Sequence, residues 1–297
     1  MSPIVLEIGG HTMSVYGADT ARIVCTSPAF RPFHTDGAAQ WEVHFGRELP
    51  SDDPLPELSR TGFPEGLGTL VFFGKEGTYR YEIVLPSGGA PLVVLHHVSG
   101  SRLVEVSPCG NPEVLRFALW LAYSLLSADV GATFVHSSVA VFRGRAVLFL
   151  GESGTGKSTH TRLWLKNIPG AHLLNDDSPV LSVRAGGGGA AVRPLVYGSP
   201  WSGKTDCYHS ASFALAAIVR LSQAPSNSIR RLSVPEAFAA LQPSLPPSLM
   251  QDERYADSLI DIVSDTIASV PVYHLGCLPD DAAALLSWRT VFGNEIQ

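Results

Sequence analysis

The first 110 residues contain short runs in which apolar and polar positions alternate, and Gly, Pro, Asp and Ser separate these runs. Alternation with a period of two is typical of strands that are buried on one face. The runs that we expect to form strands are Thr12 to Tyr16, Arg22 to Thr26, Trp41 to Phe45, Thr69 to Phe73, Tyr79 to Leu85 and Pro91 to Val98. Their spacing predicts an antiparallel, mainly β N-terminal domain over residues 1–110.

The pattern changes after residue 110. Apolar residues dominate from Pro112 to Ala128, and we expect a helix there, with Asn111 as its N-cap and Pro112 at its first position. Its longest apolar run, Phe117 to Leu126, is roughly ten residues and therefore too short to span a bilayer. We interpret it as a buried helix that leads a second domain, residues 111–297.

The second domain mixes predicted strands and helices, which indicates an α/β fold of mixed type. The expected strands are Thr133 to Phe142, Arg145 to Leu150, Ala171 to Leu174, Val180 to Arg184, Ala191 to Tyr197, Phe213 to Leu221 and Pro271 to Leu275. The expected helices are Thr159 to Lys166, Ser233 to Leu241, Asp252 to Ile267 and a last helix that Asp280 and Asp281 open. The glycine tract 186–189 predicts a flexible turn inside a hairpin.

Residues 151–158 read Gly-Glu-Ser-Gly-Thr-Gly-Lys-Ser and match the P-loop pattern G-x-x-x-x-G-K-[ST] in full. A predicted strand precedes them and a predicted helix follows, so backbone amides and a helix N-terminus can converge on a β-phosphate. Glycine is needed because a Cβ would obstruct the approach of backbone to phosphate. The residues expected to bind nucleotide are Gly151, Ser153, Gly154, Thr155, Gly156, Lys157, Ser158 and Thr159.

Two further roles follow from this loop. Lys157 would reach the β- and γ-phosphates, and the Ser158 hydroxyl would bind Mg²⁺. The triplet Asn175-Asp176-Asp177 follows a later apolar strand, where a carboxylate should emerge beside the phosphates. One aspartate could hold Mg²⁺ and the other could accept a proton from an attacking hydroxyl or water. The alternative for this triplet is a solvated turn or a helix cap.

A second stretch, Gly198 to Thr205, satisfies the same literal pattern with Pro200 and Trp201 inside it. No clear helix follows, which argues against a second phosphate cradle. The stretch is either a glycine-rich turn or a segment in which Lys204 and nearby amides face the γ-phosphate or the acceptor. We favour the second interpretation, because the stretch follows the strand pair that begins with the aspartates.

Other candidates are weaker. His136 lies in a predicted strand, and a lone histidine in an apolar stretch is more often a satisfied core residue than a catalyst. His160 and Arg162 follow the loop on its helix, where a surface position is the default. Arg230 and Arg231 form a basic pair, and an arginine near the acceptor could stabilise phosphoryl oxygens, with a solvated surface as the equal alternative.

Composition narrows the class of protein. The chain has 297 residues and is 45% hydrophobic, enough for a sizeable core. Its net charge is −6 and its 21 basic residues are spread along the chain, so we expect no nucleic-acid partner. The four cysteines lie far apart, which favours reduced thiols over a zinc or redox motif. The N-terminus carries no basic, apolar leader, so we expect a cytoplasmic protein without a membrane segment.

The set His136-Ser137-Ser138, Gly151 to Ser158 and Asp176-Asp177 resembles the HPr kinase/phosphorylase family over about residues 130–290. The catalytic domain of that family carries a strand histidine, a P-loop and paired aspartates in this order. The chain also looks like smaller relatives, among them kinases of ribosomal precursor peptides such as lasso peptides and phosphoenolpyruvate carboxykinase-like proteins. The stretch Tyr197 to Thr205 is similar to these smaller relatives.

The resemblance implies a P-loop catalytic domain of the HPr kinase/phosphoenolpyruvate carboxykinase type. It implies that His136 contacts phosphate or the aspartates, that Asp176 is the metal-side carboxylate and that Asp177 takes the serine proton. After Asp176-Asp177 the chain lacks an Arg-Gly-Ile-Gly-type signature. The resemblance therefore leaves the phosphorylase activity, the HPr substrate and the hexameric assembly of the bifunctional enzymes open, and the acceptor that we expect is an HPr-like protein or a ribosomal precursor peptide.

We thus expect a kinase that uses ATP and Mg²⁺ to phosphorylate a serine of a protein or peptide, with Ser158 and Asp176 on the metal. Lys157 and Lys204, with Arg231 as a further candidate, would stabilise the transferred phosphoryl group. A homo-oligomer is compatible with the sequence. The alternatives are a nucleotide-gated binding protein without transfer activity and a carboxykinase-like small-molecule phosphotransferase.

Overall fold

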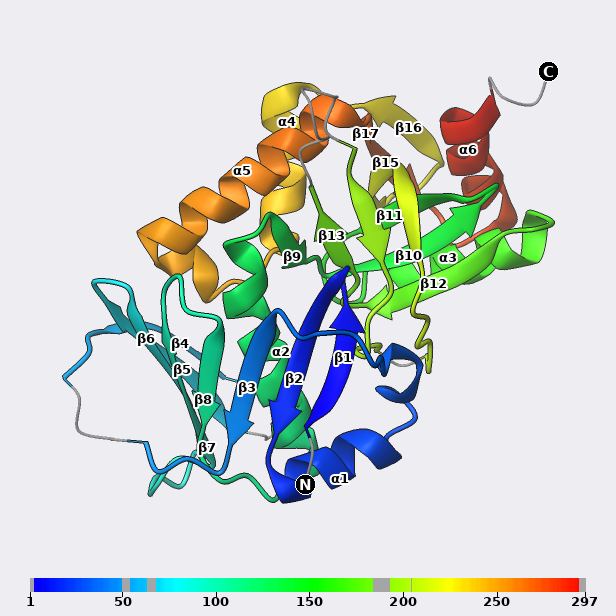
Figure 1. Ribbon diagram of the computed structural model, residues 1–297. Coiled ribbons are helices and arrows are strands. Elements are labelled where there is room, and N and C mark those ends of the chain that lie inside the picture. The colour runs from blue at the N-terminus through cyan, green and yellow to red at the C-terminus, as the bar shows by residue number, and fades with distance from the viewer. Residues whose placement is uncertain (1–2, 50–53, 63–67, 184–192, 204, 294–297) are drawn as a thin grey trace, which may run out of the picture. The chain divides into compact units, whose positions relative to one another are not determined.

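The computed structural model describes residues 3–49, 54–62, 68–183, 193–203 and 205–293. The chain divides into two compact units: unit 1 comprises Met1–Val130 and Pro247–Ser258, and unit 2 comprises Gly131–Pro246 and Leu259–Gln297. The fold is mixed α/β, and the described residues form two mixed sheets and six α-helices (Figure 1). None of the helices in this described part is both long enough and apolar enough to cross a membrane.

Unit 1 contains a sheet with the strand order β1-β2-β3-β8-β7-β6-β5-β4. The strands are β1 (Ile4–Ile8), β2 (His11–Tyr16), β3 (Trp41–Phe45), β4 (Glu57–Gly62), β5 (Thr69–Lys75), β6 (Thr78–Val84), β7 (Val93–Val98) and β8 (Leu103–Val106). β3 pairs in parallel with both β2 and β8, so the prediction of an antiparallel region is wrong for these strands. The reason is the long connection from β2 to β3, which returns the chain in the same direction.

The expected strand Arg22 to Thr26 is instead the second half of helix α1 (Ala18–Thr26). Its buried residues are Thr20, Ala21 and Val24, a spacing that places them on one helical face. A short 3₁₀ turn, η1 (Arg31–Phe33), follows α1.

Helix α2 (Pro112–Ala128) has the predicted bounds and the predicted cap. Asn111 Oδ1 accepts hydrogen bonds from the amides of Glu113 at 2.9 Å and Val114 at 3.3 Å. The Tyr123 hydroxyl donates to the carbonyl of Ile8 at 3.2 Å, which ties α2 to the sheet of unit 1. The helix that we assigned to the second domain therefore lies in unit 1, which extends to Val130 and not to residue 110.

Unit 2 contains the second sheet, with the order β12-β10-β11-β15-β14-β13-β9, and β17 pairs with both β15 and β16. β15 is parallel to β11 and to β17. The strands are β9 (Ala132–Phe134), β10 (Ser137–Phe142), β11 (Arg145–Leu150), β12 (His172–Asp177), β13 (Val180–Ser182), β14 (Leu195–Tyr197), β15 (Ser212–Gln223), β16 (Ser228–Arg231) and β17 (Val272–Cys277).

Two helices, α3 (Lys157–Asn167) and α6 (Asp281–Phe292), pack against one face of this sheet (Figure 1). Trp164 of α3 is fully buried and meets the rings of Phe149 and Phe292 edge-on. The remaining helical segments are α4 (Val234–Leu241), η2 (Gln242–Ser244), η3 (Leu249–Gln251) and α5 (Glu253–Ser269). The boundary between the two units falls inside α5.

Two local predictions for unit 2 need correction, and a third is confirmed. The run Thr133 to Phe142 is interrupted, because the amides of Val135 and His136 leave the sheet and donate to the carbonyls of Pro179 and Ser244. Asp176 and Asp177 are the last residues of β12 and do not follow it. β13 and β14 form the predicted hairpin, while the glycine tract between them lies outside the described residues.

The order β12-β10-β11 brings the ends of three neighbouring strands together. β10 is antiparallel to both neighbours, with Ser138 opposite Phe149 of β11 and Ser137 opposite Asp177 of β12. The start of β10 therefore lies beside the carboxyl ends of β11 and β12. In open α/β sheets, ligands bind outside the carboxyl ends of strands.

Candidate functional site

The loop that matches the P-loop pattern connects β11 to α3, as its sequence predicted. Gly154 has a φ of 82° and Gly156 a φ of 101°, in the left-handed region that favours glycine. A Cβ on Gly151 would lie 2.5 Å from Thr155 Oγ1, so a larger residue would have to displace the Thr155 hydroxyl. The Thr155 hydroxyl donates to the carbonyl of Glu152 and closes the loop. The glycines at these positions thus permit a tight turn directly before a helix N-terminus.

Lys157, the first residue of α3, folds back over this loop. Its Nζ donates to the carbonyls of Gly151 at 2.8 Å and Glu152 at 3.2 Å, and it lies 3.0 Å from His136 Nε2. Burial lowers the pKa of Lys157, and the nearby carboxylates of Asp177 and Asp176 oppose this shift without cancelling it. The amine is thus held at the mouth of the loop by carbonyl oxygens and an imidazole.

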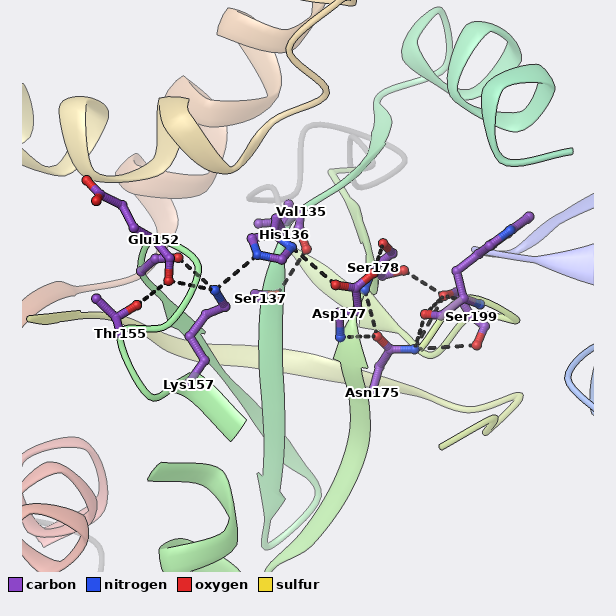
Figure 2. A network of polar contacts seen from close by, with 12 residues as sticks. Val135, His136, Ser137, Glu152, Thr155, Lys157, Asn175, Asp177, Ser178 and Ser199 are labelled. Carbon is purple, nitrogen blue, oxygen red and sulfur yellow. Dashed lines mark hydrogen bonds and ion pairs between the residues drawn. The ribbon is translucent and has the colours of Figure 1, made fainter. Parts of the chain in front are cut away.

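His136 connects Lys157 to Asp177 (Figure 2). Its Nδ1 lies 3.3 Å from Asp177 Oδ1, while the Ser178 hydroxyl donates to Asp177 Oδ2 at 2.9 Å. When Lys157 is an ammonium, it can only donate, so a neutral His136 accepts at Nε2 and carries its proton at Nδ1. The imidazole then donates to Asp177 and fixes the carboxylate relative to the loop.

The ionisation of Asp177 reflects these contacts. Burial raises its pKa, but the hydrogen bonds from His136 and from the Ser178 hydroxyl, together with the charge of the Lys157 ammonium, outweigh burial, so the net pKa is lowered. The side chain is 38% exposed and can therefore be approached from the cavity described below. Asp177 is a carboxylate at neutral pH. Each of its oxygens already has one partner and can accept one further hydrogen bond.

Asp176 and Asp177 project to opposite faces of β12, because consecutive strand residues alternate. Asp176 pairs with Ser138, so the two side chains share a face. The Ser138 hydroxyl contacts Thr161 Oγ1 of α3 at 2.7 Å, which identifies this face as the one that α3 covers. Asp176 is only 6% exposed. One aspartate therefore lies on the helix side of the sheet and the other on the His136 side.

Asn175 and Ser199 hold the second P-loop-like stretch against the end of β12 (Figure 2). Asn175 is fully buried, donates to the carbonyl of Trp201 at 3.1 Å, and accepts from the amides of Asp177 at 3.1 Å and Ser178 at 3.0 Å. Ser199 Oγ donates to the carbonyl of Ser178 at 2.6 Å. We did not single out Ser199 from the sequence.

The stretch Gly198 to Thr205 continues beside β12. Asp177 forms a β-bridge with Ser202, and the amide of Gly203 donates to the carbonyl of Asp176 at 2.9 Å. Gly203 also lines the cavity described in the next paragraph, as do both aspartates. Lys204 lies outside the described residues, so its predicted position stays a prediction.

A cavity of about 340 Å³ lies where these elements meet. Most of the predicted catalytic and metal-binding residues line it: His136, Lys157, Ser158, Asp176 and Asp177. Ser153, Gly154, Gly156 and Thr159 of the loop line it as well. Gly151 and Thr155 are not in this lining, and their contacts with each other and with Glu152 lie within the loop.

Other predicted residues lie elsewhere or differ from expectation. Arg231 is exposed in β16 and is not among the described residues that line this cavity. Arg162, for which we expected an ordinary surface position, lines the cavity, and its Nε donates to the carbonyl of Ser158 at 3.2 Å. The expected surface position of His160 is wrong, since it is 3% exposed and its Nε2 lies 3.0 Å from Ser287 Oγ.

Ser158, Asp176 and Asp177 all line this cavity, and hydroxyl and carboxylate oxygens are ligands that Mg²⁺ prefers. Among the described residues, no three His, Cys, Asp or Glu side chains gather as a complete metal site. Mg²⁺ usually takes one or two carboxylates and completes its shell with water and phosphate oxygens. The donor set therefore fits a Mg²⁺ that arrives with a phosphate ligand.

No protein-family profile and no curated protein matches the sequence. Among solved structures, the chain is similar to the HPr(Ser) kinase/phosphatase from Coxiella burnetii, with a TM-score of 0.32 and 14% identity. The match covers 55% of this chain and 89% of that protein. The likeness is distant, and no residue role is taken from it.

Proposed function

We propose that this chain is an ATP- and Mg²⁺-dependent serine kinase that phosphorylates a protein or peptide. The observation that carries the proposal is the continuous contact from Lys157 through His136 to Asp177, which joins a glycine loop to a carboxylate across one cavity. A phosphoryl group on the loop and a hydroxyl beside the carboxylate would then be neighbours.

The phosphates of the nucleotide occupy the loop in this proposal. The amides after Gly154 and the N-terminus of α3 favour negative charge there. Lys157 exchanges its contacts with the carbonyls of Gly151 and Glu152 for contacts with phosphate oxygens. These oxygens carry negative charge and therefore attract the ammonium more strongly than the carbonyls do. Ser158 and Asp176 hold Mg²⁺, which when bound neutralises charge on the phosphate oxygens.

Asp177 is the base in the transfer step. The serine hydroxyl gives its proton to a carboxylate oxygen of Asp177, and its oxygen forms a bond to the γ-phosphorus. The bond from that phosphorus to the β,γ-bridging oxygen breaks, and ADP is released. Positioning and charge stabilisation dominate such phosphoryl transfers, so His136 contributes by fixing Asp177 and Lys157 relative to each other.

The acceptor in this proposal is a serine of an HPr-like protein or of a ribosomal precursor peptide such as a lasso-peptide precursor. The similar protein from Coxiella burnetii is described as a kinase/phosphatase for HPr(Ser), and HPr is therefore the first acceptor to test. A cytoplasmic location and a possible homo-oligomer belong to the same proposal.

The test is intact-mass analysis of HPr and of precursor peptides encoded nearby in the genome, after incubation with the protein, ATP and Mg²⁺. We expect a gain of one phosphate that requires Lys157 and Asp177. Lys157→Ala and Asp177→Asn should abolish the gain, and Asp177→Asn should still bind ATP.

Two exposed residues of the same types serve as matched controls for these variants. Lys166→Ala, on the outer side of α3, and Asp206→Asn should both retain transfer. ATP binding without transfer to any acceptor would favour a nucleotide-gated binding protein. Transfer to a small molecule alone would favour a carboxykinase-like phosphotransferase.

A further inference from the structure

A second and larger cavity, of about 610 Å³, adjoins the loop on the other side of the start of α3. It shares Gly154, Gly156 and Thr159 with the cavity that holds Lys157 and the aspartates. A Cβ built on Gly154 or on Gly156 would meet no atom within 4 Å, so the space beside the loop is open at these two residues. The two cavities are therefore connected along the glycine loop.

The larger cavity, which we call the apolar cavity, has mainly apolar walls. Side chains from α3, from the end of β15 and from the end of β17 form them: Leu163, Leu221, Ala224, Pro225, Cys277 and Leu278. Among the described residues that line it, the only titratable groups are Cys277 and His160. His160 is 3% exposed, and its Nε2 lies 3.0 Å from Ser287 Oγ. The described lining contains no Lys or Arg side chain that would attract a phosphate.

We propose that the apolar cavity binds the base of the nucleotide whose phosphates occupy the glycine loop, an inference that rests on the proposed function. A nucleoside triphosphate joins a charged triphosphate to a flat, uncharged base. The smaller cavity with Lys157 suits the triphosphate, and the connected apolar cavity suits the base. Ligand sites that combine apolar walls with a few polar groups are typical for such rings.

The acceptor is a less suitable occupant of the apolar cavity. A serine hydroxyl must approach Asp177, which lines the smaller cavity and not this one. The base, in contrast, has to lie on the side of the loop that faces away from the γ-phosphate. This geometry assigns the smaller cavity to the acceptor and the larger one to the base.

Cys277 provides a direct probe, because it is half-buried in the wall of the apolar cavity. The full-length protein is labelled with N-ethylmaleimide alone, with saturating ATP and Mg²⁺, or with inorganic triphosphate and Mg²⁺, and labelling is measured peptide by peptide. ATP should slow the labelling of Cys277 at least about tenfold, since saturating ligand leaves few free sites. Triphosphate should not slow it, and the exposed Cys25 should react equally in all three samples.

Each result has a definite meaning. Equal protection by ATP and triphosphate would overturn the inference, because the loop alone would then account for it. Unchanged labelling of Cys277 in a sample where calorimetry shows bound ATP would also overturn it, and would leave the proposed function intact. Absence of binding by both ATP and triphosphate would reject the proposed function and the inference with it.

A variant gives an independent measurement. Ala224→Phe fills the apolar cavity and should weaken ATP binding at least about tenfold, the loss expected when a well-packed ring is displaced, while triphosphate binding is unchanged. Ala268→Phe, at an exposed position of α5, is the matched control and should bind both ligands normally. Undiminished ATP affinity in Ala224→Phe would overturn the inference. If Ala224→Phe also loses triphosphate binding, the substitution has damaged the loop. The protection of Cys277 by ATP in the wild type then decides whether the apolar cavity binds the base.

Discussion

His136 Nε2 lies 3.0 Å from Lys157 Nζ, so a residue just before β10 contacts the first residue of α3. The opposite ring nitrogen faces Asp177 at 3.3 Å. One imidazole thus sets the distance between the amine that would contact phosphate and the carboxylate that would accept the proton. In the proposed reaction, His136 is therefore a positioning residue.

His136→Gln should therefore reduce the turnover number more than it raises the KM for ATP. A glutamine cannot contact both partners in the same geometry, and small misplacements of reacting groups can cost about 100-fold in rate. Steady-state kinetics with the identified acceptor would measure the effect. His209→Gln changes an exposed histidine of unit 2 and should leave both constants unchanged. A pure KM effect in His136→Gln would contradict the positioning role.

Gly156→Ala should weaken nucleotide binding. Gly156 has a φ of 101°, where any Cβ is strained, and it lies between the loop and the first turn of α3. Gly170→Ala is a matched control, since Gly170 has a φ of 88° and equally open space but lies at the far end of α3. Both variants should lose about 1 kcal/mol or more of stability. Calorimetry should show reduced ATP affinity only for Gly156→Ala, and equal losses would argue against a role of the loop in binding.

Asn175→Ala should lower both stability and activity. The side chain is fully buried and links Trp201 to the amides of Asp177 and Ser178, so its removal leaves several buried polar groups unpaired. Each such group costs about 1–3 kcal/mol. Urea unfolding should show the loss, whereas Asn167→Ala, a half-buried asparagine at the end of α3, should cost less. A stable but inactive Asn175→Ala would show that the bonds orient Asp177 without stabilising the fold.

The stability of the protein should depend on pH through His160. Burial lowers the pKa of this histidine to about 4, from an ordinary 6.5. The unfolded state then binds the proton more readily, so the stabilisation is fully present above pH 6.5 and is lost as pH falls towards 4. Between pH 7 and pH 5 this group should cost about 2 kcal/mol.

Urea unfolding at pH 7 and pH 5 measures this dependence. His160→Gln should show a weaker loss of stability between the two values than the wild type. His172→Gln, which changes an exposed histidine of β12, should keep the dependence of the wild type. Identical pH dependence in the wild type and His160→Gln would show that His160 is not held neutral by the fold.

Local patterns predicted many elements but not how they pair. The cap at Asn111 and the bounds of α2 were predicted, because capping depends on adjacent residues. The segment Arg22 to Thr26 was misread as a strand because its β-branched residues suit one, while burial of Val24 with Thr20 and Ala21 selects a helix. Short strands such as β16 depend on a partner from elsewhere in the chain, and sequence alone does not reveal that partner.

The same distinction applies to the candidate site. The loop 151–158 and the aspartates stand out as motifs, whereas His136 resembles a core residue until β10 is placed between β11 and β12. Arg220 was not singled out from the sequence either; it pairs with Leu150, directly before the loop, and its guanidinium lies 3.9 Å from Glu152. We singled out Arg231 because it stands next to another arginine in the sequence. In the structure it is exposed on β16 and is not among the described residues that line the cavity.

Asp176 and Asp177 project to opposite faces of β12, so the face that each occupies depends on whether the number of residues before it in the strand is odd or even. Insertion of one residue between Leu174 and Asp176 would turn the pair over relative to β10, so that each carboxylate would meet the surroundings of the other. Insertion of two residues would restore their faces, although it would displace the strand end. The different roles proposed for the two acids would thus depend on whether each holds an odd or an even position along the strand, and identical side chains could fill both positions.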